Sequence, residues 1–431
     1  MARMADKSKV IACSTPLRLS GKNFMRLQFE ANLPDTHTRG GYCDDPAGAT
    51  ECEYDRAASC ITKTGLMSTI TYNSFRPGEP WPDDKQVHIN AHGGGVLFHA
   101  GVYYWFGEHK IEGEAGNAAH VGVHVYSSHD LYNWKDEGIA LAVGDDPQSP
   151  IVRGCILERP KVIFNSRTKK FVMWFHLEPK DAGYTGSLSG VAVADNVTGP
   201  FRFVDVFRPN AGVWPANVPT ADKHPLSAEE LTELEGRELL GGPVPYYPKH
   251  LLFRRDFAGG QMARDMTLFV DDDGSAYHLY ASEANGTLHI SELSDDFLKP
   301  AGTFIRIFPG RFHEAPSIFK AHGKYFLFSS DCTGWAANTA RLCVAANIFG
   351  PWEELGNPCL GPGELIANTF NSQSTFVLPV QGRTGAFILM ADRWNPANAI
   401  DGRYVWLPIK FKHGVPTVSW HDEWDLSYFD K

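Results

Sequence analysis

The chain has 431 residues, a formal net charge of −10 at pH 7 and an isoelectric point near 5.9. This acidity argues against a polyanionic partner, so we expect neither nucleic acid nor an acidic membrane surface as a partner. No run of about 18 apolar residues occurs, and no membrane span is predicted.

Residues 1–85 are irregular and rich in Gly, Pro, Asp and Thr. We interpret them as an N-terminal extension packed on the domain that follows. The first residues lack the apolar core of a signal peptide. We expect a secreted or periplasmic protein whose signal has been removed, with the cytoplasm as the alternative.

From residue 86 to 431 one pattern recurs five times. Each copy opens with a polar residue, has Gly, Thr or Pro two positions on, and has a β-branched or aromatic residue four positions on. An aromatic-rich strand follows each copy after a turn, as in Tyr103-Tyr-Trp-Phe. We call the opening polar residues the lead residues, and they are His92, Glu158, Asp265, Glu314 and Gln373.

Strand pairs repeated at intervals of tens of residues are typical of a β-propeller. The sequence therefore predicts an all-β fold, a five-bladed β-propeller, with the lead residues around one axis. The last blade is expected to include Asp425-Leu-Ser-Tyr-Phe as a strand. Residues 207–255 form an insert that interrupts the repeated strand pattern, and Ser227-Ala-Glu-Glu230 predicts a capped short helix within it. We interpret this insert as a wall or lid over the cleft, with a cover for a blade edge as the alternative.

The chain has eight cysteines and no Cys-x-x-Cys pair, which weakens a zinc or redox motif. Two clusters allow either local disulfides or free thiols; they are Cys43, Cys52 and Cys60, and Cys332, Cys343 and Cys359. No cofactor and no metal are predicted. A calcium ion on the axis is an alternative, but the carboxylates show no dedicated calcium loop.

Converging carboxylates indicate cleavage of glycosidic bonds, which needs an acid for the leaving oxygen and a second group for water or the sugar. We assign Glu314 as the general acid because an apolar strand follows it. Glu158 is expected to hold the pKa of Glu314 high and to orient it. Asp265 is expected to bind sugar hydroxyls or to share that task. Any single one of these acids has a turn-forming role as its alternative reading.

Several motifs together resemble glycoside hydrolase family 43 over residues 78–430. They are Ile89-Asn-Ala-His-Gly-Gly-Gly-Val-Leu, Tyr103-Tyr-Trp-Phe-Gly-Glu108, Leu157-Glu-Arg-Pro-Lys-Val-Ile-Phe-Asn, His313-Glu-Ala-Pro-Ser-Ile-Phe, Asn371-Ser-Gln-Ser-Thr and Glu423-Trp-Asp-Leu-Ser. The branch that they resemble holds exo-β-1,3-galactanases and related arabinogalactan-processing enzymes. The resemblance implies a five-bladed propeller and an inverting mechanism.

Most of that family has a catalytic aspartate at the start of the first blade, where this chain reads Ala91-His-Gly-Gly-Gly. The galactanase-like branch shares this absence, and there a glutamine matching Gln373 is proposed to position or activate the water as its imidic acid tautomer. The same matching implies that Glu314 is the acid and Glu158 the second carboxylate. It also implies sugar-binding residues, which are Glu108, Tyr184, Asp265 and Thr333.

Two further residues are candidates for substrate binding. Trp335 is expected to stack on the leaving-group side, with blade packing as the alternative, and His92 is included with axial packing as the alternative.

The leading hypothesis is an exo-acting inverting hydrolase that releases terminal galactose or arabinose from arabinogalactan-type polysaccharides, exo-β-1,3-galactanase-like or an α-L-arabinofuranosidase. A non-catalytic carbohydrate-binding propeller, a β-galactofuranosidase and a protein scaffold are the alternatives. The expected partner is an oligo- or polysaccharide, and the sequence sets no oligomeric state.

Overall fold

The computed structural model describes residues 71–113, 115–118, 120–234 and 251–430. The chain divides into two units, Met1–Leu66 and Met67–Lys431, and every described residue belongs to the second. Most of the predicted extension over 1–85 therefore lies outside the described residues, as does the cysteine cluster at Cys43, Cys52 and Cys60.

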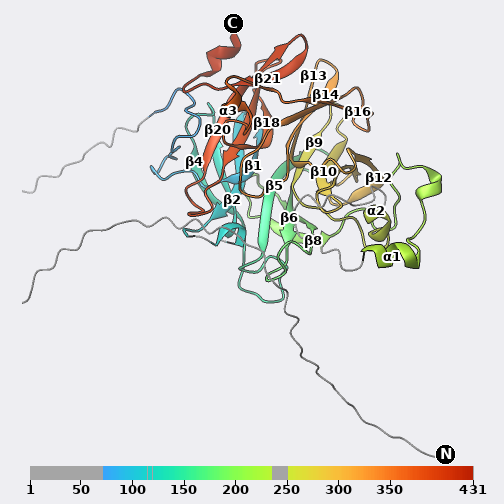
Figure 1. Cartoon of the computed structure of the whole chain (residues 1–431). Coiled ribbons are helices and arrows are strands. Elements are labelled where there is room, and N and C mark those ends of the chain that lie inside the picture. Colours follow the sequence, from blue (N-terminus) through green and yellow to red (C-terminus); the bar gives the residue numbers. More distant parts are fainter. Residues whose placement is uncertain (1–70, 114, 119, 235–250, 431) are drawn as a thin grey trace, which may run out of the picture. The chain divides into compact units, whose positions relative to one another are not determined.

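Five sheets, each containing four consecutive antiparallel strands, form the blades of a propeller (Figure 1). The strands of blades 1 and 2 are β1 (His92–His99), β2 (Val102–Lys110), β3 (His120–Ser128), β4 (Lys135–Ala142), β5 (Ile156–Asn165), β6 (Lys170–Glu178), β7 (Leu188–Ala194) and β8 (Arg202–Phe207). Those of blades 3 and 4 are β9 (Met266–Val270), β10 (Ala276–Ser282), β11 (Thr287–Leu293), β12 (Pro300–Ile307), β13 (Glu314–Ala321), β14 (Lys324–Ser330), β15 (Arg341–Ala345) and β16 (Trp352–Gly356).

Blade 5 contains β18 (Gln373–Pro379), β19 (Phe387–Arg393), β20 (Arg403–Lys412) and β21 (Val415–Ser419). A short strand, β17 (Cys359–Leu360), adds to its edge in parallel with β21. The segment predicted as a final strand is instead the 3-10 helix η3 (Leu426–Asp430). The prediction was wrong because the Asp425 carboxylate accepts a hydrogen bond from the Ser427 N–H at 2.7 Å, which starts a turn.

The innermost strands β1, β5, β9, β13 and β18 contact one another in that order, and β18 returns to contact β1. The ring is therefore closed, which confirms the predicted five-bladed propeller. Directly after three lead residues the backbone is left-handed, at Gly93, Arg159 and Ala315, with φ of 59°, 55° and 50°. The pairing register shifts at the same points. Such bulges re-aim neighbouring side chains and are common beside active sites.

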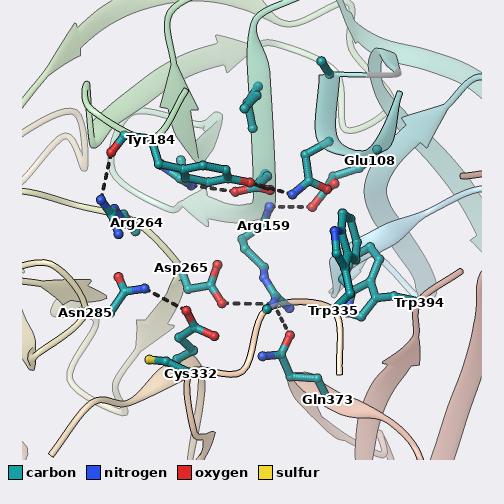
Figure 2. Close-up of a pocket in the computed structure, with 18 of the residues that line it drawn as sticks. Glu108, Arg159, Tyr184, Arg264, Asp265, Asn285, Cys332, Trp335, Gln373 and Trp394 are labelled. Atoms are coloured by element: carbon teal, nitrogen blue, oxygen red, sulfur yellow. Dashed lines mark hydrogen bonds and ion pairs between the residues drawn. The ribbon is translucent and has the colours of Figure 1, made fainter. Parts of the chain in front are cut away.

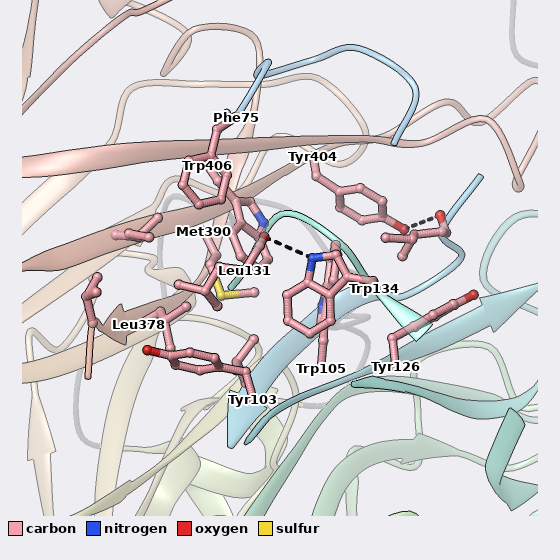
Figure 3. Close-up of a cluster of buried hydrophobic side chains, with 14 of the residues drawn as sticks. Phe75, Tyr103, Trp105, Tyr126, Leu131, Trp134, Leu378, Met390, Tyr404 and Trp406 are labelled. Carbon is pink, nitrogen blue, oxygen red and sulfur yellow. Dashed lines mark hydrogen bonds between the residues drawn. The ribbon is translucent and has the colours of Figure 1, made fainter. Parts of the chain in front are cut away.

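Blades 1 and 5 meet through a cluster of buried aromatic rings (Figure 3). The ring centroids of Trp105 and Trp406 lie 4.8 Å apart. Phe75, from the segment before the first blade, stacks on Trp424 at 4.4 Å and exchanges backbone hydrogen bonds with it at 2.7 and 3.1 Å. Residues near Phe75 thus fasten the first and last parts of the propeller together.

The insert runs between β8 and β9. Its helix α1 (Ala228–Leu234) begins with the predicted capping box, in which Ser227 and Glu230 exchange hydrogen bonds of 2.8 and 3.2 Å. The amide of Ala216 donates to Phe304 on β12, and the Asn217 side chain pairs with the backbone of Arg306. Since β12 is the outermost strand of blade 3, these described residues cover a blade edge rather than forming a wall over the cleft.

The remaining short helices are η1 (Gly116–Ala118), η2 (Thr220–Asp222), α2 (Leu252–Arg255) and α3 (Gly363–Ile366). Within the described ranges, none of the helices has the length and apolar character that crossing a membrane requires. Cys332, Cys343 and Cys359 are free thiols, so the disulfide alternative for this cluster is wrong.

Candidate active site

A pocket of about 500 Å³ opens where the innermost strands begin (Figure 2). Four of the five lead residues line it, namely Glu158, Asp265, Glu314 and Gln373. Glu108, Tyr184 and Trp335 line it as well. The structure therefore brings together most of the candidates that the sequence indicated, from five different blades.

Glu314 stands at the start of β13 with its carboxyl group in a sheltered position. Its Oε1 accepts a hydrogen bond of 2.7 Å from the Asn285 amide. Burial, together with the negative charge of Asp265, raises the pKa of Glu314 to about 8. The group is therefore protonated at neutral pH and can donate a proton. The sequence assigned this effect to Glu158, with Asp265 sharing it as an alternative, and the neighbouring charge that raises the pKa is that of Asp265.

Glu158 differs from Glu314 in that its pKa is lowered and not raised. Its Oε1 accepts a hydrogen bond of 2.7 Å from the Tyr184 hydroxyl, and its Oε2 pairs with His176 at 2.9 Å. Burial raises the pKa of Glu158, but the hydrogen bond and charge of His176 outweigh that effect and lower the pKa to about 2. Glu158 is thus negatively charged while Glu314 is neutral. Two carboxyl groups with separated pKa values can take different roles in one reaction.

His176 lies between Glu158 and Glu178, with its second ring nitrogen 2.9 Å from Glu178. Burial lowers the pKa of His176, but the two carboxylates outweigh it and raise the pKa to about 9. Ligand atoms of Glu158, His176 and Asp265 lie within 4.8 Å of one another, as a metal site would require. In this arrangement both ring nitrogens of His176 pair with carboxylates, those of Glu158 and Glu178, so neither nitrogen points to an open coordination position.

Arg159 contacts three other residues that line the pocket, and the sequence did not indicate it as a site residue. Its guanidinium group donates to the Gln373 oxygen at 2.5 Å and pairs with Asp265 at 3.0 Å. Its backbone N–H donates to Glu108 at 2.9 Å. Burial lowers the pKa of Arg159, but the charges of Asp265 and Glu108 outweigh it, so the guanidinium stays charged.

Gln373 is held at both ends of its amide. Its oxygen accepts from Arg159, and its nitrogen donates to the Ser330 hydroxyl at 2.8 Å. The amide therefore has one fixed orientation beside the acid-bearing blade. A group held in this way can position a water molecule for attack.

Glu108, in the pocket lining, is almost fully buried and forms an ion pair of 2.7 Å with Lys110. It approaches Gly93 so closely that a Cβ at that position would lie 2.3 Å from its Oε1. Because the backbone at this position is also left-handed, with φ of 59°, a side chain at position 93 would be strained as well as crowded. Burial raises the pKa of Glu108, against the lowering effect of Lys110.

Two of the residues that the sequence indicated for substrate binding, His92 and Thr333, lie outside the pocket lining. His92 is 1% exposed and packs against Trp394 and Tyr404, with ring centroids 5.3 and 5.7 Å away, so it is a core residue rather than part of the pocket lining. The Thr333 hydroxyl donates to the Ala336 carbonyl at 2.6 Å and shapes its own loop, outside the pocket lining. Its neighbour Trp335 is 44% exposed and meets Trp394 edge-on at 6.1 Å.

Other lining residues that the sequence analysis missed are Asn285, Cys332, Arg264 and Trp394. A thiol at Cys332 hydrogen-bonds with Glu314, and Arg264 donates to the Tyr184 carbonyl at 2.8 Å. Arg159 and Arg264 had a usable signal, since each is a charged residue next to a lead residue at a buried strand start and needs compensating partners.

The chain is similar to a protein family and to several solved structures. The model for Glycosyl hydrolases family 43 matches residues 244–362. A solved family 43 β-1,3-galactosidase in complex with galactodeoxynojirimycin is 47% identical, with a TM-score of 0.76, over 82% of this chain and 100% of that one. None of the curated proteins compared with the chain matches it.

Two exo-β-1,3-galactanases are also similar. The Phanerochaete chrysosporium enzyme, solved with β-1,3-galactotriose, is 30% identical, with a TM-score of 0.65, over 82% of this chain and 68% of that one. The Clostridium thermocellum enzyme is 30% identical, with a TM-score of 0.65, over 81% of this chain and 66% of that one.

Proposed function

Because the chain belongs to glycoside hydrolase family 43, we propose that it is an exo-acting, inverting β-1,3-galactosidase. The observation that carries the proposal is the pocket, in which a protonated Glu314 faces a charged Glu158 and an oriented Gln373. The similar solved enzymes act on β-1,3-linked galactose, which supports the same linkage here. The substrate is the galactose-bearing end of a galactan or arabinogalactan chain.

In the proposed reaction, the terminal galactose lies in the pocket with its glycosidic oxygen toward Glu314. Glu314 gives its proton to that oxygen as the bond to the anomeric carbon breaks. A water molecule positioned by Gln373 attacks the anomeric carbon from the other face and gives its proton to a second water molecule, and the Glu314 carboxylate takes up a proton from solvent before the next turnover. The carboxylate of Glu158 stabilises the positive charge that develops on the sugar, and Tyr184 orients that carboxylate.

The raised pKa of Glu314 argues against a non-catalytic binding module, because binding a neutral sugar does not require a proton donor. Terminal arabinofuranose and galactofuranose are the substrates to be tested against galactopyranose. We expect galactose release from β-1,3-galactan, no arabinose release from an arabinofuranoside-substituted arabinogalactan, and no sugar release from a galactofuranoside. Release of arabinose or of galactofuranose-derived galactose would overturn the assignment of the sugar.

The pH dependence of the reaction gives a second test. The acid must be protonated, and the pKa of Glu314 is about 8. We therefore expect kcat/KM to have its maximum value well below pH 8 and to fall tenfold per pH unit above it. The pKa of Glu158 near 2 places its acid limb far below neutrality. Measuring kcat/KM from pH 4 to 10, with circular dichroism to follow folding, checks this. An alkaline limb centred near pH 5 would contradict the raised pKa of Glu314, and loss of activity in Glu314→Gln separately tests whether it is the acid.

A further inference from the structure

The segment from Tyr184 to Ser187 is held from outside the blade that contains it. Each of its four carbonyl groups accepts a hydrogen bond from a residue near one of the two ends of the connection between β8 and β9 that carries the insert. Arg264 donates to the Tyr184 carbonyl at 2.8 Å, as Figure 2 shows, and the Ala263 N–H donates to that of Ser187 at 2.9 Å. Arg208 donates to the carbonyls of Thr185 and Gly186 at 2.9 and 2.8 Å.

The same segment is joined to the charged groups beneath the pocket. The Glu178 carboxylate accepts hydrogen bonds from the N–H groups of Gly186 and Ser187 at 2.6 and 2.9 Å, and it also pairs with His176. At the other end, the Tyr184 hydroxyl accepts from Asn117 at 2.6 Å and donates to Glu158. The position of this segment therefore sets the position of Tyr184 against the Glu158 carboxylate.

The fold of the insert fixes Arg208 in turn. The two ends of the insert are paired, since the Gln261 N–H donates to the Pro209 carbonyl at 2.7 Å. Gly260, with φ of 90°, passes so close that a Cβ there would lie 2.2 Å from the Arg208 carbonyl oxygen. Asp256, just after α2, is 3.8 Å from the Arg208 guanidinium. Arg208 itself does not line the pocket.

We propose that the insert is a clamp for the sugar-binding pocket and that Arg208 is a positioning residue acting through Tyr184. The clamp holds the Tyr184–Ser187 backbone, and thereby keeps the Tyr184 hydroxyl against Glu158 before substrate arrives. Pre-ordering of this kind lowers the entropic cost of binding, so its loss weakens substrate binding more than it slows the chemical step. The link to sugar binding rests on the proposed function, whereas the clamp itself does not.

The test replaces Arg208 with methionine, which keeps the length of the side chain and removes its donors. Hydrogen–deuterium exchange measures the Gly186 and Ser187 amides, with amides of β6 as the internal reference. We expect exchange at least about tenfold faster at these two amides. Arg208→Lys, which can donate to one carbonyl, is expected to restore part of the protection. Arg167→Met, an exposed arginine paired with Asp295, is the charge-matched control and is expected to change nothing.

A double-mutant cycle with Tyr184→Phe then tests whether Arg208 acts through Tyr184. With β-1,3-galactobiose we expect Arg208→Met to raise KM about tenfold and to change kcat less than threefold. In the Tyr184→Phe background the same replacement is expected to have no further effect. Unchanged exchange, or fully additive losses, would overturn the clamp. If the unaltered protein does not act on galactobiose, the exchange result still stands and only the proposed function fails.

Discussion

Replacing Glu314 with glutamine is expected to lower kcat/KM for a β-1,3-linked galactoside by about 10³-fold or more, while the propeller stays folded. The amide has nearly the shape of the carboxylic acid and can keep the contact with Asn285, but it cannot give a proton to the leaving oxygen. Initial rates with β-1,3-galactobiose, together with a melting curve, measure the effect.

A substrate with a good leaving group provides the matched control for this variant. A 2,4-dinitrophenyl β-galactoside needs little protonation when its bond breaks, so the variant is expected to act on it within about tenfold of the unaltered enzyme. Near-normal turnover of galactobiose by Glu314→Gln removes Glu314 from the acid role. An equal loss on both substrates indicates instead that the change disturbs sugar binding.

Replacing Gln373 with alanine is expected to lower kcat by about 10²-fold to 10³-fold. The alanine lacks the amide that Arg159 and Ser330 hold in place, so no group remains in the pocket at that position to orient the attacking water. The measurement is kcat and KM with β-1,3-galactobiose, and we expect KM to change far less than kcat.

Azide distinguishes a water-positioning role for Gln373 from a disturbed pocket. It needs no deprotonation and fits the space that the side chain leaves, so we expect it to restore turnover in Gln373→Ala with α-galactosyl azide as product. The matched variant Gln373→Asn keeps the amide but has a shorter side chain. Its turnover without azide is expected to lie between that of Gln373→Ala and that of the unaltered enzyme. If Gln373→Ala retains activity within tenfold without azide, water activation comes from another group, with Glu108 and Glu158 as the remaining candidates.

The propeller could be predicted because its signals are local in sequence. Each blade repeats a lead residue, a buried strand and an aromatic-rich partner strand, and the capping box around Ser227 is complete within four residues. The final segment near Asp425 was predicted wrongly because an aromatic-rich pattern fits a strand and a 3-10 turn equally well, and a side-chain hydrogen bond decided between them.

The pocket could be predicted only in part because its contacts join different blades. Arg159 binds Gln373 of blade 5 and Asp265 of blade 3, and no spacing in the sequence reveals that convergence. The same limit led to the choice of Glu158 as the neighbour that raises the pKa of Glu314. The carboxylate of Glu158 pairs with the buried imidazole of His176, and the charge that raises the pKa of Glu314 is that of Asp265.

His92 illustrates a further limit. It occupies a lead position in the repeat, yet its ring lies in the core beside Gly402, where a Cβ would come within 1.9 Å of the imidazole. Such close packing depends on a residue about three hundred positions away in the chain. A repeat therefore predicts where a strand begins but not which way the first side chain points.

The most direct test of the central claim follows the first anomer released from β-1,3-galactotriose by proton NMR. An exo-acting inverting enzyme with Glu314 as its acid is predicted to release α-galactose first, together with β-1,3-galactobiose, and Glu314→Gln is predicted to release neither. Initial release of β-galactose would contradict inversion, and release of no galactose by the unaltered protein would contradict the proposed activity.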